Sequence, residues 1–142
     1  MILLIFWKEK DFYMTLNNII LNIEMADTPE KQTAGLMFRK KLDDDAGMCF
    51  SFLRPQILKF WGKNTLIPLD IAFVSHDNKI VNIERIMPFD LKEVCSKEPC
   101  CYAIETNIGF FDKNKISSGH TIKIDKDRNK LIISKKTKDD ID

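Results

Sequence analysis

The chain has 142 residues, of which 44% are hydrophobic and 30% are charged, and its formal net charge is +1. This length and composition are typical of one soluble globular domain that buries roughly two thirds of its unfolded surface. The balance of 22 basic and 21 acidic residues lacks the basic signature of a nucleic-acid-binding domain. We therefore expect no nucleic acid partner.

The chain begins with MILLIFWKEKDFYM, a short apolar run followed by charges at Lys8, Glu9 and Lys10. The run is shorter than the ~20 residues of a transmembrane helix, so we expect no transmembrane segment. A secretory signal has its positive charge before the apolar core, and this segment does not. Residues 1–17 are open to three interpretations: a first strand, a decayed or truncated export signal, or an extension upstream of a true start at Met14. We expect a cytoplasmic location from the sequence as it stands, or a periplasmic or envelope location if a signal segment has been lost or truncated.

The first predicted element is a half-buried strand over residues 18–25, NIILNIEM, in which apolar and polar side chains alternate. A two-turn helix is expected next, because Thr28 suits the N-cap, Pro29 the first helical position and Gly35 the exit. After the helix, we expect the chain to carry Leu36, Met37 and Phe38 into the core.

The rest of the chain alternates short strands with turns. The predicted elements are a strand over 47–53 ended by Arg54-Pro55-Gln56, a hairpin of 69–75 and 79–87 joined by Asp77-Asn78, a strand over 100–107, and a short helix or turn, a glycine and a last strand over 109–124. Residues 125–142 form a charged C-terminal tail in which LIIS offers an extra strand. This pattern predicts a mainly β fold, a compact antiparallel β-barrel or sandwich-like single domain over 18–124 with one or two short helices.

The four cysteines are Cys49, Cys95, Cys100 and Cys101, and no C-x-x-C motif occurs. With only two histidines, far apart in the sequence, we expect no metal site and no cofactor. Cys49 is predicted to be a buried or half-buried strand thiol. The segment CSKEPCC would close a disulfide loop in an oxidising compartment and stay reduced in the cytosol, and we favour small side chains in a loop and the following strand.

Segment 58–74, LKFWGKNTLIPLDIAFV, places polar residues inside what otherwise looks like a buried strand. Asp70 falls between apolar neighbours, where a carboxylate costs several kcal/mol unless it is paired or hydrogen-bonded. We expect its partner to be Lys63, Asn64 or Arg39, and a pair with Arg39 would be bidentate.

One aromatic side chain with a few convergent polar groups is typical of a small-molecule site. The predicted ligand-binding residues are Trp61, Lys63, Asn64, Arg39, Asp70 and Glu105. In the competing interpretation, Trp61 is a core or rim residue, and Asp70 and Glu105 are satisfied framework carboxylates. No nucleophile, phosphate-loop or zinc-hydrolase motif is present, so we assign no catalytic residue.

Taken in order, several blocks resemble the uncharacterised bacterial and archaeal family called domain of unknown function 192. They are ADTPE (26–30), GLMFR (35–39), GMCF (47–50), FWGKNTLIPLD (60–70) and YAIE (102–105), followed by Gly109 and Gly119. The resemblance covers about residues 19–124 and implies a compact, mostly antiparallel β-barrel-like fold. It supplies no established activity, cofactor or catalytic residue. Many relatives carry an export or lipoprotein signal, which implies the cell envelope.

The chain departs from the family pattern at several positions. Gly62 stands where relatives usually have methionine, and Cys49 where they have leucine. Relatives also commonly have arginine near Lys31 and Gln32. The change at Gly62 removes a large side chain beside Trp61.

Three functions are consistent with these residues. The favoured one is a binding module for a small polar or anionic ligand. The alternatives are a hydrolase-like or lyase-like enzyme that uses Asp70 or Glu105 with Lys63, and a purely structural envelope-associated protein. The sequence does not indicate the oligomeric state.

Overall fold

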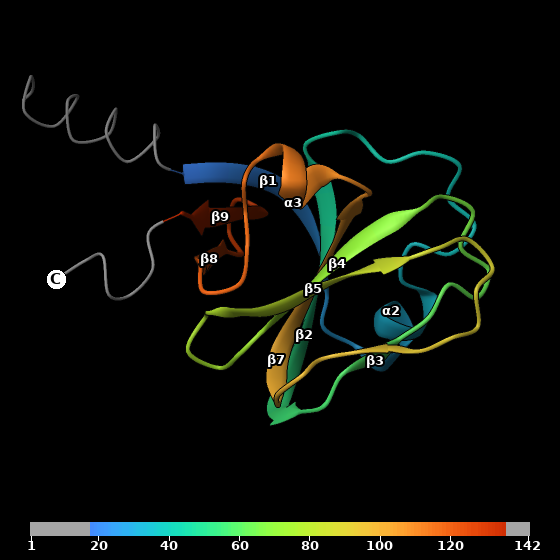
Figure 1. Cartoon of the computed structure of the whole chain (residues 1–142), viewed down its shortest axis with the longest axis horizontal. Helices are drawn as coiled ribbons and strands as arrows, with labels where there is room; N and C mark the ends of the chain where they lie inside the picture. Colours follow the sequence, from blue (N-terminus) through green and yellow to red (C-terminus); the bar gives the residue numbers. More distant parts are fainter. Residues whose placement is uncertain (1–17, 136–142) are drawn as a thin grey trace, which may run out of the picture.

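The computed structural model describes residues 18–135, which fold into a curled seven-stranded sheet, two short helices and a two-stranded ribbon (Figure 1). The interpretations of residues 1–17 and of the last residues of the tail lie outside the described range. The elements are β1 (Asn18–Ala26), α2 (Pro29–Ala34), β2 (Ala46–Gln56), β3 (Lys59–Phe60), β4 (Leu69–Val74), β5 (Ile80–Ile86), β6 (Val94–Cys95), β7 (Cys100–Asn107), α3 (Phe110–Lys113), β8 (Thr121–Asp125) and β9 (Lys130–Ser134).

The large sheet has the strand order β5-β4-β7-β2-β1-β9-β8, and β3 pairs with β6 in the ribbon. Its pairs are antiparallel except β1 with β2, which are parallel. The sheet curls until the ends of its two edge strands meet, since the Ile80 N–H donates to the His120 carbonyl at 2.9 Å and the Gly119 N–H to the Ile80 carbonyl at 2.8 Å. This half-barrel confirms the predicted mainly antiparallel, barrel-like fold. The parallel pair was not predicted.

Two apolar clusters lie on opposite faces of the sheet. On one face, Cys49, Ala72 and Ile104 pack with Phe110 and Phe111 of α3. The alternate residues of the same strands face the other way, where the cluster includes Met48, Phe50, Ile71, Phe73 and Ala103 together with Leu36 and Leu58 from the segments that cover this face. The central strands are therefore covered on both sides, which is why all of β4 is buried.

The helix prediction is confirmed in detail. The Thr28 hydroxyl accepts a hydrogen bond from the Lys31 N–H at 3.2 Å, Pro29 opens α2, and Gly35 ends it with φ 47°. The expectation for Phe38 is wrong, because its side chain is 68% exposed. Its backbone takes φ 63° and its N–H donates to the Asn64 carbonyl at 2.9 Å, which directs the side chain to solvent.

The end of β2 is a second correction. The strand continues through Arg54 and Pro55 to Gln56, with a register shift between Ser51 and Gln56. The irregular stretch accommodates a proline that cannot donate to a ladder, so the residue that was expected to end the strand lies within it. β2 therefore remains long enough to reach Cys100 at the start of β7.

The hairpin of β4 and β5, strand β7, helix α3 and strand β8 occur where they were predicted. The LIIS segment forms β9, which lies between β1 and β8. The part of the chain that follows residue 124 therefore contributes an inner strand of the sheet.

The four cysteines are free thiols in the structure. Cys49 is fully buried, as predicted, and burial raises the pKa of its thiol to about 12. Cys95 lies in β6, and Cys100 and Cys101 begin β7.

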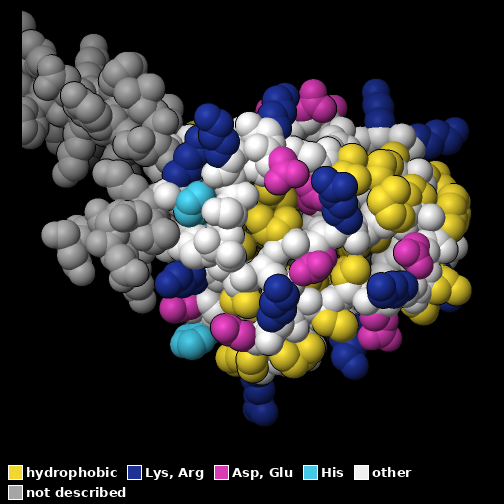
Figure 2. Space-filling model, in the orientation of Figure 1, with side chains coloured by type: hydrophobic (Ala, Val, Ile, Leu, Met, Phe, Trp, Pro, Cys, Tyr) yellow, Lys and Arg dark blue, Asp and Glu magenta, His cyan; other side chains and the backbone are white. Residues whose placement is uncertain are grey.

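Hydrophobic side chains also gather at one end of the surface, to the right in Figure 2. The loop after α2, the turn near Gly62 and the connection from β5 to β6 lie at this end in Figure 1. Their exposed apolar residues include Phe38, Trp61, Met87 and Phe89. Within residues 18–135, no helix is both long and apolar enough to cross a membrane.

Candidate functional site

A groove of about 760 Å³ lies between α2 and residues 56–65, and we call it the α2 groove. Its walls include Gln32 from the helix and four aromatic residues, Phe50, Phe52, Phe60 and Trp61. Four of the predicted ligand-binding residues line it: Trp61, Lys63, Asn64 and Glu105. The groove therefore brings together a turn and a strand that are far apart in the sequence.

The turn that carries Trp61 and Lys63 is fixed by backbone contacts of Gly62. The Gly62 N–H donates to the Asp90 carbonyl at 2.7 Å, and the Gly62 carbonyl accepts from the Phe89 N–H at 2.8 Å. A Cβ atom on Gly62 would lie 2.0 Å from the Met87 carbonyl oxygen. The loop from Met87 to Asp90 thus occupies the space where a side chain at position 62 would begin.

Trp61 and Lys63 lie on either side of this glycine at the rim of the groove. The Trp61 side chain is 43% exposed, and the Lys63 ammonium lies 5.3 Å from the centroid of its ring. This is the geometry of a cation–π contact, which holds the ammonium without neutralising its charge. Lys63 forms no ion pair with the rest of the described chain.

Helix α2 is attached to the sheet by Gln32. Its side-chain amide donates to the Ser51 carbonyl at 2.8 Å and to the Ala26 carbonyl at 3.3 Å. At the end of the helix, a Cβ atom on Gly35 would lie 3.4 Å from the ring of Phe50. These close contacts hold one wall of the groove against the strands below it.

Glu105 lies in β7 and is only 5% exposed. Its cross-strand neighbours are Met48 on β2 and Ile71 on β4, both apolar and buried. Burial raises the pKa of its carboxyl to about 8, and no charged group lowers it. The carboxyl has no hydrogen-bond or ion-pair partner within residues 18–135.

The carboxyl oxygens of Glu105 reach the α2 groove. No fully enclosed side-chain nitrogen or oxygen of the described residues lacks a hydrogen-bond partner. Because Glu105 has no partner, its oxygens must keep some accessible surface, and the residue lines the groove. Buried polar groups are normally satisfied, so this carboxyl stands out as a group available to a bound molecule.

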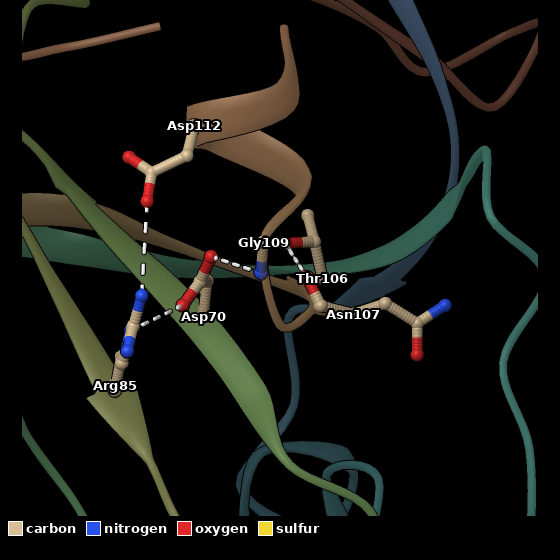
Figure 3. Close-up of polar contacts among 6 residues, drawn as sticks. All are labelled: Asp70, Arg85, Thr106, Asn107, Gly109 and Asp112. Atoms are coloured by element: carbon tan, nitrogen blue, oxygen red, sulfur yellow. Dashed lines mark hydrogen bonds and ion pairs between the residues drawn. The ribbon is translucent and has the colours of Figure 1, made fainter. Parts of the chain in front are cut away.

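Asp70 has a different environment, at the end of the sheet beside α3 (Figure 3). Its carboxylate accepts a hydrogen bond from the Gly109 N–H at 2.8 Å and lies 3.9 Å from Arg85 Nε. Arg85 also reaches the carboxylate of Asp112 at 3.7 Å. Burial raises the pKa of Asp70, and the Gly109 N–H and Arg85 oppose that shift.

The partners predicted for Asp70 are therefore wrong. Arg39 does form a bidentate pair, but with Glu24 on β1, at 2.8 Å and 2.6 Å. This pair lowers the pKa of Glu24 through its hydrogen bonds to the guanidinium. Arg39 and Asp70 do not line the α2 groove.

The structure also separates the two acids of the enzyme hypothesis. Asp70 is paired with Thr106, and Glu105 is paired with Ile71, so the acids occupy alternate positions of neighbouring strands. Side chains alternate across a strand, and Asp70 and Glu105 consequently point to opposite faces of the sheet. A mechanism that needs both carboxylates in one site is not supported by this geometry.

Arg85 and Gly109 are polar partners that the sequence interpretation missed. The Asp77-Asn78 turn carried a usable signal for Arg85, because a hairpin folded there brings residues 70 and 85 together across its strands. Gly109 carried no such signal, since its N–H reaches Asp70 through the path of the chain after β7.

No group of three or more His, Cys, Asp or Glu side chains within residues 18–135 is placed to hold a metal ion. The acidic residues Asp43, Asp44 and Asp45 are exposed. The Asn22 side-chain amide donates to Asp45 at 3.0 Å. These observations leave the α2 groove as the site with the strongest geometric support.

The fold and the groove define a small, curled β domain with a partly aromatic groove on one face of its sheet. The model of the DUF192 family, described as "Uncharacterized ACR, COG1430", matches residues 13–124, and the chain belongs to this family. No curated protein matches the chain.

Two solved structures are similar to the chain. A protein of unknown function from Novosphingobium aromaticivorans DSM 12444 has 36% identity and a TM-score of 0.67, with 69% of this chain and 71% of that chain covered. A protein from Sinorhizobium meliloti 1021, described as a "putative transcription regulator", has 35% identity and a TM-score of 0.68, with 70% of this chain and 78% of that chain covered. These neighbours share the fold with this chain.

Proposed function

We propose that the protein is a binding module for a small polar or anionic molecule, and that the ligand occupies the α2 groove. The observation that carries this proposal is the position of Glu105, a buried carboxyl with no partner among residues 18–135, at a groove lined by Trp61, Lys63 and Asn64. Small-molecule sites combine aromatic walls with a few converging polar groups. The α2 groove has both.

The polar groups of the groove have distinct roles in this proposal. The ammonium of Lys63, held over Trp61, supplies positive charge at the rim for an oxygen-rich end of the ligand. Asn64, the next residue in the chain, also lines the groove. Phe50 and Phe60, whose rings meet edge to face with centroids 4.9 Å apart, give the wall a fixed shape.

A thermal-shift screen of metabolites against the whole protein tests the proposal. We expect at least one small polar compound to raise Tm, because a ligand that binds only the native state stabilises it. Trp61→Ala and Lys63→Ala should each abolish that rise. The matched controls are Phe89→Ala and Lys115→Ala, which change an exposed aromatic and an exposed lysine outside the groove and should retain it.

A screen without any hit would overturn the proposal and favour a structural role. A hit that survives both Trp61→Ala and Lys63→Ala would place the binding site elsewhere. NMR chemical-shift changes confined to α2, residues 57–65 and the end of β7 would locate the ligand in the groove independently of stability.

A further inference from the structure

Glu105 is the buried acid of the α2 groove, and no described residue around it forms a hydrogen bond or ion pair with its carboxyl. Its strand neighbours Met48 and Ile71 are apolar. Gln32 uses its amide nitrogen on the carbonyls of Ala26 and Ser51. An ionised carboxylate is stable in such surroundings only when donors or a cation approach it.

The cations of the groove are located at its rim. Lys63 lies over the ring of Trp61, and Lys59 is exposed and lies 4.0 Å from Glu93. Lys59, Lys63 and Glu105 are the titratable residues that line the groove, since α2 and β2 contribute uncharged side chains there. No charged group contributes to the pKa of Glu105. A counter-charge for the ionised form of Glu105 must therefore come from outside the described chain.

The walls of the groove favour a positive charge. Phe50, Phe60 and Trp61 contribute aromatic rings to it, and the faces of such rings attract cations. Trp61 already makes this contact with Lys63. A neutral hydrogen-bonding group would gain little from the rings, and a negative group would be repelled by Glu105 once the acid ionises.

We propose that the α2 groove recognises a protonated nitrogen, such as an alkylammonium or guanidinium group, and that Glu105 is the carboxylate that pairs with it. This inference rests on the proposed function and adds the class of ligand. The ligand is a small molecule with a basic nitrogen at the end that meets Glu105 and oxygen acceptors at the end that meets Lys63 and Asn64.

The proposal has a direct consequence for pH. Because burial raises the pKa of Glu105 to about 8, the acid is mostly protonated at pH 6 and must ionise to pair with an ammonium. An alkylammonium stays protonated to about pH 10. Apparent affinity is reduced by the fraction of protein in the competent state, so binding should strengthen about tenfold from pH 6 to pH 7 and level off above pH 8.

Three small probes of matched shape separate the alternatives: n-butylamine, 1-butanol and butanoate. Binding is measured by NMR titration of the whole protein at pH 6, 7, 8 and 9. We expect butylamine to bind most tightly and to show the rise with pH. Glu105→Gln keeps the shape of the side chain and should weaken butylamine binding and flatten its pH profile. Glu98→Gln, an exposed acid outside the groove, is the control and should leave both unchanged.

The Glu105 carboxyl carbon provides a second measurement. Its NMR chemical shift should follow a titration of the carboxyl group near pH 8 in the free protein, and saturating butylamine should move that titration to lower pH. Titration near the ordinary value of 4.5 in the free protein would overturn the inference.

Failure of the inference is distinguishable from failure of the proposed function. Tighter binding of butanoate or 1-butanol in the groove, weakening as pH rises, would show that Glu105 donates a hydrogen bond to an acceptor. The proposed binding function would then be supported, and the proposal of an amine ligand would be wrong. If no probe and no metabolite perturbs the groove, both proposals fail.

Discussion

Asp70 and Glu105 are two buried acids on neighbouring strands, and they differ in whether the protein around them supplies a partner. They are 4% and 5% exposed, but they point to opposite faces of the sheet. Asp70 accepts a hydrogen bond from the Gly109 N–H and lies near Arg85, whereas Glu105 has no partner within residues 18–135. An acid that is satisfied within the protein stabilises the fold, and one that is not remains available to a ligand.

The two acids also contribute differently to the stability of the fold. The Asp70 carboxylate connects β4 to the turn that begins α3, so it fixes the path of the chain after β7. Glu105 forms no such link within the described part of the chain, and its burial without a partner there reduces stability at any pH where it is charged. A cost of this kind is expected where a group is retained for binding.

The largest expected effect is the response of stability to pH. The folded-state pKa of Glu105, about 8, lies above its ordinary 4.5. The native state therefore holds a proton that the unfolded state releases, and this stabilisation is complete below pH 4.5 and is lost as pH rises through 8. Glu105→Gln has no such loss, so at pH 9 its free energy of unfolding should exceed that of the wild type by on the order of 4 kcal/mol.

Urea unfolding of both proteins at pH 5, 7 and 9 measures this difference. The two should be nearly equal at pH 5 and diverge as pH rises. Glu98→Gln serves as the control, because its side chain is exposed and should follow the wild type. Parallel pH curves for wild type and Glu105→Gln would mean that Glu105 is paired after all, and the contrast with Asp70 would disappear.

Removal of the Asp70 carboxylate, which has partners in the protein, should lower the stability instead of raising it. Asp70→Ala leaves the Gly109 N–H without its acceptor and should destabilise the protein by about 3 kcal/mol at pH 7. Asp70→Asn keeps an acceptor oxygen and should cost less. Asp112→Ala is the control, because this second partner of Arg85 has a side chain that is 84% exposed, and it should change stability by less than about 0.5 kcal/mol. Urea unfolding of the three variants would contradict the assignment if Asp70→Ala resembled Asp112→Ala.

Gly62→Ala tests whether the turn beside the groove depends on close backbone packing. The added Cβ would meet the Met87 carbonyl oxygen at 2.0 Å, so the loop from Met87 to Asp90 must move. We expect a loss of about 2 kcal/mol, as in other overpacked sites, and NMR shift changes at Trp61 and Lys63.

The matched control for this change is Gly109→Asn. Nothing lies within 4 Å of a Cβ at Gly109, and its φ of 86° is one that asparagine tolerates better than most residues. It should cost less than Gly62→Ala and preserve the N–H that Asp70 accepts. If Gly62→Ala changed neither the stability nor the NMR spectrum, the loop from Met87 to Asp90 could move at no cost and the turn would not depend on this packing.

Local patterns predicted the elements of this fold well. The Thr28-Pro29-Gly35 signals determined α2, the Asp77-Asn78 turn determined the β4–β5 hairpin, and alternation determined β7. Each of these depends on residues close in the sequence. The fold class and the family predicted from the sequence are both correct.

Which residues pair with the site residues depends on the order of the strands in the sheet, and local sequence patterns do not predict that order. The parallel pairing of β1 with β2 and the place of β7 between β2 and β4 decide which side chains share a face. Without that order, Arg39 was an equally good partner for Asp70, although it pairs with Glu24. Trp61, Lys63, Asn64 and Glu105 line one groove, and their role in ligand binding stays a prediction.

The smallest expected effect separates the two partners of Asp70. The Arg85 side chain is 63% exposed and its closest contact with Asp70 is 3.9 Å, so solvent screens the pair. Arg85→Ala should therefore cost less than about 1 kcal/mol and raise the pKa of Asp70 slightly further. The Gly109 N–H, at 2.8 Å from the carboxylate, then carries most of the stabilisation. A double-mutant cycle of Arg85→Ala with Asp70→Ala measures the coupling by urea unfolding, and an energy above about 2 kcal/mol would assign that role to the arginine instead.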